Sequence, residues 1–508
     1  MPRFVLALVI VISLVCSPGA TAATLYRGAT LLTLSEANNA PLTDSYLLVS
    51  GAGLITAIGT GDGSGDPAVA AARAAPGFAT VDLTGRIVMP GFISGHSHLW
   101  QSAFRGIGPA TELEAWLNAL HFTYGQHFVA GDFAAYTKHG AYDQLRHGVT
   151  TTYNHSHFFG GDFSFYLEQF EAGLATPQRF IFAWVNDARA DDATWLARIE
   201  PILPQVQPRA DRALLGVAIN AAGVYRGPGV LEREIAFARK LNLPVQTHYL
   251  EPSASQVADR ALWPRYKTAG GVFPGMSFAH FIHPDETILR EAAAAGVAMI
   301  WNPLSNGRLA SGLPKIEKYL AAGLRVGMGV DGQASADISD PFENVRLGLY
   351  ALRMRNENAG GLQPIDLLRL HTLKTAEVLG VARHVGSLEV GKFADFLVVN
   401  PGEPGTGPVW DVAATLVFAC SSRNLAAVYI GGKKTVELGR VVNHDAVALE
   451  AESMPALPLS APVKPPHRSA RRKENKARAP DRLRASLSPL RAQPTSRPQK
   501  NRAQLGAV

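Results

Sequence analysis

Cysteine is almost absent from the sequence. Only Cys16 and Cys420 occur among its 508 residues. We expect Cys16 to be removed with an N-terminal signal, so Cys420 has no partner and an intrachain disulfide is excluded. Stability must therefore come from the hydrophobic core. A chain of 508 residues, 47% of them hydrophobic, is long enough to bury a large core.

The sequence also lacks an apolar run that would span a bilayer comfortably. The N-terminal run, residues 4–15, follows a positive residue, Arg3, and precedes the small residues Ala20, Thr21 and Ala22. This order is typical of a signal peptide with cleavage near Ala22. We therefore expect residues 1–22 to be a signal peptide and the protein to be exported, to the periplasm or outside the cell. A membrane anchor is the alternative, and we expect no stable membrane span.

Residues 1–450 carry little net charge, in contrast to the C-terminal segment. Residues 451–508 contain thirteen Lys or Arg and three acidic residues, a net charge of +10, whereas the whole chain carries +6. Residues 1–450 therefore carry about −4 by the same count. The segment is rich in Pro, Ser, Ala and Arg, so we expect a basic disordered tail. Its charge could tether the protein to anionic surfaces, but we favour a solvated extension and expect no specific nucleic-acid partner.

Apolar strands alternate with amphipathic helical stretches through the middle of the chain. Eight strands are predicted: one that ends at His98, then 149–153, 179–185, 213–219, 244–248, 277–280, 297–301 and 325–331. Continuous apolar strands separated by helices indicate a parallel sheet covered on both faces. Eight units favour an α/β fold of the (β/α)8 TIM-barrel type over a doubly wound open sheet, and its active site would lie at the C-terminal strand ends.

Short β segments flank this barrel on both sides. They are predicted at 24–27, 46–50, 54–59 and 81–83, and again at 395–399 and 425–434. We expect the two groups to form one small composite β-sandwich. The predicted domains are thus 1–22 (signal peptide), 23–88 (sandwich), 89–384 (barrel), 385–450 (sandwich) and 451–508 (tail).

Histidines and acids follow four of the predicted barrel strands. His96 and His98 are two residues apart at the end of the first strand, so their side chains project from the same face. His248, His280 and Asp331 end the fifth, sixth and eighth strands. Three imidazoles and a carboxylate suit one divalent metal and leave a position for water. A metal lowers the pKa of a bound water to about 7, which supplies hydroxide at neutral pH.

Several segments resemble the amidohydrolase superfamily, in particular its aminohydrolase branch of chlorohydrolases and deaminases. Residues 90–98, PGFISGHSH, resemble the first motif of the superfamily, and the resemblance continues at 247–251, 279–283, 302–312, 329–335 and 385–395. The resemblance covers roughly residues 24–445. The resemblance implies His96, His98, His248 and Asp331 as metal ligands. It also implies Glu251 and His280 as acid/base groups, while Asp331 holds the attacking water and takes its proton.

This resemblance implies a metal-dependent hydrolase of non-peptide C–N bonds, most simply one that deaminates an amino-substituted heterocycle by a metal-bound hydroxide. The expected partner is a small-molecule substrate. A hydrolase of cyclic or linear amides is one alternative. An exported, non-catalytic binding protein on a barrel scaffold is the other. Homo-oligomerisation is left open.

Six residues are candidates for substrate contact. Trp301 stands where members of the branch often carry a histidine, and its ring could stack on a flat substrate or fill the mouth of the barrel. For Arg105 a structural ion pair is an equal alternative, and for His155 a surface position. The full set is Trp100, Gln101, Arg105, His155, Trp301 and Asn306.

The sequence further predicts one metal ion rather than two. Two-metal members of the superfamily typically bridge their ions with a modified lysine at the end of the fourth strand. That strand, 213–219, is followed by Asn220 and Ala221, with no lysine, cysteine or acid. Two dications without a bridging anion would repel one another. We expect one divalent ion per chain, with zinc favoured over iron.

Overall fold

The computed structural model describes residues 22–444 except 158–162, 222, 226 and 228. The predicted tail lies outside the described residues, as does the predicted signal peptide apart from Ala22. Among the described helices, none is both long and apolar enough to cross a membrane.

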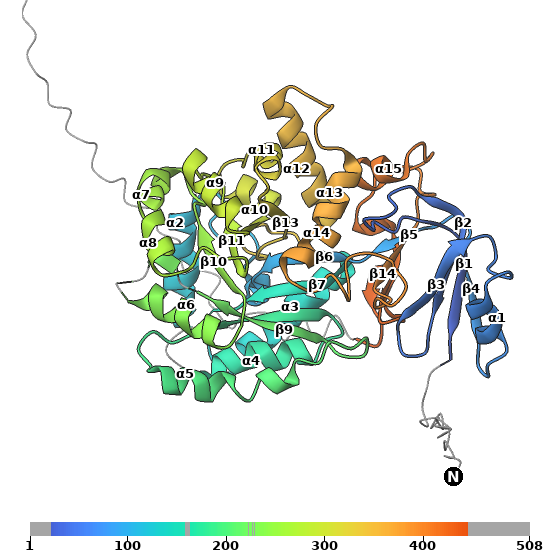
Figure 1. The fold of residues 1–508 in the computed structure, drawn as a ribbon, viewed down its shortest axis with the longest axis horizontal. Helices are drawn as coiled ribbons and strands as arrows, with labels where there is room; N and C mark the ends of the chain where they lie inside the picture. Colours follow the sequence, from blue (N-terminus) through green and yellow to red (C-terminus); the bar gives the residue numbers. More distant parts are fainter. Residues whose placement is uncertain (1–21, 158–162, 222, 226, 228, 445–508) are drawn as a thin grey trace, which may run out of the picture. The chain divides into compact units, whose positions relative to one another are not determined.

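Eight parallel strands form the barrel at the centre of the described chain (Figure 1). They are β6 (Phe92–Ser97), β7 (Val149–His155), β8 (Arg179–Val185), β9 (Leu214–Asn220), β10 (Val245–Tyr249), β11 (Met276–His280), β12 (Ala298–Trp301) and β13 (Arg325–Met328). Each strand pairs with the next along the chain. Between the first and last strands, Asp331 N donates to His96 O at 3.0 Å and Val330 N to Ser94 Oγ at 3.0 Å. The predicted TIM barrel is confirmed.

Helices follow most of the strands and cover the outside of the barrel (Figure 1). Several begin at an aspartate whose carboxylate accepts a backbone N–H of the first turn, as Asp191, Asp285 and Asp340 do. The helices are α1 (Pro67–Arg73), α2 (Leu113–Leu117), α3 (Asp132–Arg146), α4 (Phe163–Leu174), α5 (Asp192–Ile199), α6 (Val230–Lys240), α7 (Gln256–Ala261), α8 (Trp263–Thr268), α9 (Glu286–Ala294), α10 (Pro303–Arg308), α11 (Ile316–Ala321), α12 (Pro341–Asn356), α13 (Pro364–Leu370), α14 (Leu373–Val378) and α15 (Val412–Phe418).

The two ends of the described chain share a second sheet of nine strands beside the barrel (Figure 1). Its strands are β1 (Thr24–Leu31), β2 (Leu42–Val49), β3 (Ile55–Thr60), β4 (Ala79–Asp82), β5 (Ile87–Pro90), β14 (Phe396–Val399), β15 (Leu425–Ile430), β16 (Lys433–Glu437) and β17 (Arg440–Val441). The N- and C-terminal groups join where β5 pairs antiparallel with β14. The composite β unit built from both segments is thus present.

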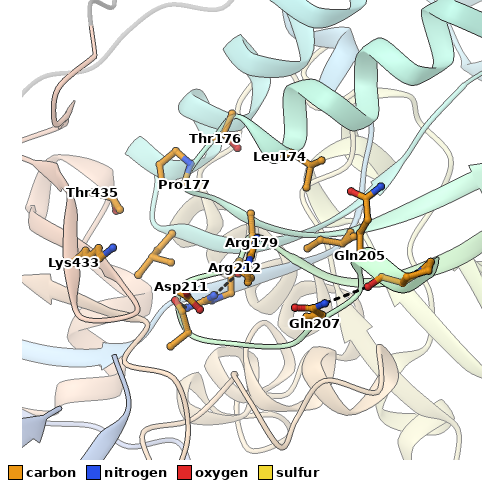
Figure 2. A pocket seen from close by; sticks show the side chains of 15 residues that line it. Leu174, Thr176, Pro177, Arg179, Gln205, Gln207, Asp211, Arg212, Lys433 and Thr435 are labelled. Carbon is orange, nitrogen blue, oxygen red and sulfur yellow. Dashed lines mark hydrogen bonds between the residues drawn. The ribbon is translucent and has the colours of Figure 1, made fainter. Parts of the chain in front are cut away.

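A buried ion pair joins the barrel to this second sheet. Arg179, the first residue of β8, donates from Nε to Asp395 Oδ2 at 2.5 Å and from Nη2 to Asp395 Oδ1 at 2.8 Å. Its remaining N–H groups donate to backbone carbonyls of 209, 210 and 212. Arg179 lines a hollow of about 600 Å³ at the N-terminal ends of the strands, which Figure 2 shows. Because its donors are already used, Arg179 serves the fold at this hollow.

We expect Asp395→Asn to lower the free energy of unfolding by about 3–5 kcal/mol, because it leaves the Arg179 guanidinium buried beside a neutral group. Urea unfolding followed by circular dichroism measures the loss. The matched control is Asp211→Asn, which breaks the exposed pair with Arg209 and should cost less than about 1 kcal/mol. Equal losses for the two variants would contradict a stabilising role for the buried pair.

Candidate active site

The first two predicted ligands lie at the C-terminal end of β6. His96 is fully buried and His98 nearly so, and their ring centroids are 4.7 Å apart. Each ring has its Nδ1 in a hydrogen bond: His96 Nδ1 lies 2.7 Å from Gln246 Oε1, and His98 Nδ1 lies 2.7 Å from the carbonyl oxygen of His155. Both oxygens can only accept, so both Nδ1 atoms carry the proton and both Nε2 atoms present a lone pair.

His248 and Asp331 approach the same point from β10 and from the loop after β13. His96 Nε2 lies 3.1 Å from His248 Nε2, and Asp331 Oδ1 lies 3.4 Å from Nε2 of both His96 and His98. Two groups of potential ligand atoms meet within 4.8 Å, and both include His96. The four predicted ligands are therefore brought together in one centre. Their role as ligands stays a prediction.

The electrostatics of this centre fit a divalent cation. Burial lowers the pKa of His98 to about 4 and that of His248 well below its usual value, so both rings are neutral. Burial alone would raise the pKa of Asp331, but the surrounding imidazoles hold it well below its usual value. Asp331 Oδ1 is buried and accepts no hydrogen bond. Zinc binds neutral imidazoles and ionised carboxylates. Both kinds of group meet here with their lone pairs directed at one point.

His280 and Glu251 stand beside the ligands. His280 Nε2 lies 3.6 Å from Glu251 Oε2 and 3.9 Å from Asp331 Oδ2. On the other side of the ring, Asn306 Nδ2 lies 2.9 Å from His280 Nδ1. With the amide donating, His280 carries its proton on Nε2, opposite to His96 and His98. Burial, with the charge of Asp331 second, holds the pKa of Glu251 well above its usual value.

Backbone strain gathers at the same strand ends. Leu250, His280, Phe281 and Asp331 all have positive φ, of 54°, 72°, 40° and 56°. Residues other than glycine rarely adopt this left-handed backbone conformation. Where they do, they often cluster at active sites, and the surrounding structure holds them in it. The positive φ values fall at the end of β11 and in the loop after β13, where His280 and Asp331 face the centre.

The centre forms the floor of a cavity of about 1170 Å³. Gln101 and His155 line it, as predicted for substrate contact. The amide oxygen of Gln101 is buried without a hydrogen-bond partner, and a Cβ on Gly332, next to Asp331, would lie 1.8 Å from it. His157, two residues beyond His155, also lines the cavity.

Four of the six substrate candidates lie outside the cavity lining, and for them the prediction is corrected. Trp100 is buried and donates from Nε1 to His157 Nδ1 at 3.0 Å, so it supports the wall from behind. Arg105 pairs with Asp143 at 2.6 Å, which is the structural alternative considered for it.

The other two corrections concern Trp301 and Asn306. Trp301 is fully buried between β12 and α12, where a Cβ on Gly348 would lie 2.8 Å from its ring. It therefore fills the helix layer and cannot stack on a substrate. Asn306 contacts His280 instead of the cavity, so it acts on the site through that ring.

Gln246 and the cavity wall contributed by α2 were not predicted from the sequence. Gln246 lies two residues before His248 on β10, and a period of two places both side chains on one face. That spacing was a usable signal. Trp116 and Leu117 of α2 line the cavity, as does His121 just beyond. No local pattern distinguishes them from core residues.

A family model described as the amidohydrolase family matches residues 87–435. The chain belongs to the amidohydrolase family. It is a hydrolase that acts on carbon–nitrogen bonds, as the motifs predicted, and the non-catalytic alternative is set aside. The chain is 27% identical over 395 residues to a 5-methylthioadenosine/S-adenosylhomocysteine deaminase of Natronomonas pharaonis, which covers 75% of this chain and 88% of the relative.

Two solved structures show the same fold. An adenosine deaminase from Xanthomonas campestris with bound zinc superposes with a TM-score of 0.75 and 25% identity, over 85% of this chain and 97% of the other. The atrazine chlorohydrolase TrzN from Arthrobacter aurescens TC1, complexed with zinc, superposes with a TM-score of 0.74 and 25% identity, over 85% and 99%. These zinc-containing neighbours and the His/Asp centre support a divalent metal in this chain.

We expect metal analysis of the active protein to give one tightly held ion per chain, because both potential ligand groups share His96 and so describe one centre. Inductively coupled plasma mass spectrometry on purified chain measures the ratio. His248→Ala should lose the ion, whereas the exposed His127→Ala should keep it. Two tight ions per chain, both needed for activity, would contradict the single centre.

We expect Asn306→Asp to lower turnover by about 10- to 100-fold without loss of metal. A carboxylate can only accept a hydrogen bond, so it favours the tautomer of His280 that carries its proton on Nδ1. Nε2 then has no proton to donate. Asn306→Ala leaves the ring unconstrained and should fall between this variant and the wild type. Turnover and metal content are measured side by side. Wild-type turnover in a folded Asn306→Asp protein would show that the His280 tautomer does not matter.

Proposed function

We propose that this amidohydrolase removes the amino group of an amino-substituted heterocycle by hydrolysis and releases ammonia. The observation that carries the proposal is the pairing of Glu251 and His280 beside the ligand set, at the floor of a cavity of about 1170 Å³. Pockets of roughly 300–1,000 Å³ hold drug-sized ligands, so there is room for a heterocycle with a substituent. The names of the deaminase relatives support substrates of the adenosine type.

A divalent ion held by His96, His98, His248 and Asp331 would lower the pKa of the attacking water, and we propose zinc because the neighbours named above contain it. Asp331 Oδ2 faces His280 at 3.9 Å and can take the proton that the water loses. Asp331 suits this role because its pKa is held well below the usual value and it is ionised at neutral pH.

Glu251 acts on the substrate as a general acid. Its raised pKa keeps the carboxyl protonated, so it can donate a proton to the ring nitrogen next to the amino-bearing carbon. This withdraws electrons from that carbon as water attacks. His280 donates a hydrogen bond from Nε2 to the water oxygen and so orients it. The proton collected by Asp331 then moves to the amino group, the C–N bond breaks and ammonia leaves. The second proton of the water returns to Glu251 as the C=O bond forms.

Export remains a separate proposal. The order of residues 1–22, with a positive residue, an apolar run and small residues before Ala23, supports a cleavable signal peptide. N-terminal sequencing of the protein recovered from a producing cell tests it. A start near Ala23 in an exported fraction is expected, and an intact Met1 in the cell interior would contradict it.

A substrate panel tests the deamination directly. Adenosine, 5′-methylthioadenosine, guanine, an aminotriazine, a chlorotriazine and a cyclic amide are each incubated with the zinc-loaded protein. Ammonia release without ring opening from at least one amino-heterocycle is expected. Ring opening of the amide, with no ammonia from any heterocycle, would favour the amide hydrolase instead, and chloride release alone would favour a chlorohydrolase.

We expect Glu251→Gln to lower kcat by about 10²- to 10⁴-fold and to keep the metal, because the amide fills the same space and has no acidic proton to give. Metal content and ammonia release are measured on the same preparation. The exposed Glu171→Gln, on α4 and outside the cavity lining, serves as the control and should change kcat little. If Glu251→Gln loses its metal, Glu251 is a ligand and the proposed acid role is wrong.

A further inference from the structure

We infer that Gln246 is a positioning residue that sets the tautomers of two imidazoles at once: the metal ligand His96 and the cavity-lining His155. One amide thereby connects the metal centre to the wall that contacts the substrate. The part that concerns His155 rests on the proposed function. The part that concerns His96 does not.

The orientation of the Gln246 amide is determined by its neighbours. The residue is fully buried on β10. Its Nε2 donates to Gly95 O at 3.0 Å and to Ser277 Oγ at 3.3 Å. A carbonyl oxygen only accepts, so the nitrogen must face Gly95 and the oxygen must face the imidazoles. The amide cannot be reversed without placing two oxygens in contact.

His96 is the nearer of the two rings. Its Nδ1 lies 2.7 Å from Gln246 Oε1, a short hydrogen bond in which the ring donates. The proton is therefore held on Nδ1, and the lone pair on Nε2 points at His248 Nε2, 3.1 Å away. Metal-binding histidines generally need such a partner on their second nitrogen, and Gln246 is that partner for His96.

His155 receives the same constraint at a longer distance. Its Nδ1 lies 3.4 Å from the same oxygen, and a carbonyl oxygen has two lone pairs, so it can accept from both rings. The ring centroid of His155 lies 4.9 Å from that of His96 and 4.7 Å from that of His248. With its proton on Nδ1, His155 offers Nε2 as an acceptor in the cavity wall. It then suits an N–H or NH₂ group of the heterocycle.

The backbone of His155 also supports the metal centre. The carbonyl oxygen of His155 accepts the Nδ1 proton of His98. The side chain of His155 can thus be changed without removing the partner of His98. This separation makes the two halves of the inference testable one at a time.

The first experiment measures zinc affinity by chelator competition and needs no substrate. Gln246→Met keeps the size of the side chain but removes the acceptor, and we expect zinc to bind about 10- to 100-fold more weakly. Gln246→Glu keeps an acceptor for both rings if the buried carboxyl takes up a proton on the oxygen that faces Gly95 O, and it should then restore binding to within about threefold of wild type. Ser277→Ala, which touches only the donor end of the amide, is the matched control and should also stay within about threefold.

The wild-type chain supplies a measurement that no folding defect can obscure. Histidine-selective ¹⁵N labelling of the metal-free protein reports which ring nitrogen carries the proton, with signals assigned by their absence in His96→Asn and His155→Asn. Protons on Nδ1 of both rings are expected. A proton on Nε2 of His96, or wild-type zinc affinity in a folded Gln246→Met chain, would overturn the inference for the metal centre.

The second experiment uses the substrate found by the panel. His155→Leu should keep zinc affinity within about threefold and raise KM more than it lowers kcat, because it removes an acceptor that binds the heterocycle. An unchanged KM would overturn the role of His155 and leave Gln246 and His96 unaffected. If no amino-heterocycle is turned over by the wild type, the proposed function fails while the zinc-affinity result still stands.

Discussion

The structure depends on one constraint: four imidazoles and two carboxyl groups are buried together at the C-terminal end of a barrel, with little exposure to solvent. Of the four rings, those of His98, His248 and His280 are neutral because burial lowers their pKa, and each buried polar atom of the set needs a partner or an ion. The chain supplies partners to one nitrogen of three of these rings, from Gln246, the His155 carbonyl and Asn306. The remaining Nε2 atoms of His96 and His98 lie beside Asp331 Oδ1, at the proposed metal position.

Closure of the barrel brings the carboxylate to that place. Asp331 reaches the ligands because its N–H donates to His96 O across the seam between the first and last strands. Gly329 makes this approach possible: a Cβ there would lie 2.8 Å from His96 O and 2.5 Å from Asn302 Oδ1. A larger residue would separate the two strands and withdraw Asp331. The positive φ of Asp331 is a local cost that the closed barrel enforces.

The barrel and the cluster of ligands could be predicted because both follow from periodicity and from where strands end. Trp301 shows the limit of that reasoning. Ile300 points into the barrel, close to Gly95, so the next side chain along the strand must point out into the helix layer. Strand parity could have revealed this, whereas the motif position alone could not. Arg105 and Asn306 depend on partners far along the chain, Asp143 and His280, which no local pattern specifies.

The proposed metal centre requires that His96, His98 and His248 bind the ion together through Nε2. Zinc-edge X-ray absorption fine structure of the loaded protein tests it most directly. We expect three imidazole nitrogens and at least one oxygen at about 2.0–2.2 Å, with no sulfur. A His248→Ala protein that is reloaded with excess zinc should lose one imidazole contribution. Two or fewer imidazoles in the wild type, or an unchanged spectrum in a zinc-reloaded His248→Ala protein, would contradict this ligand set.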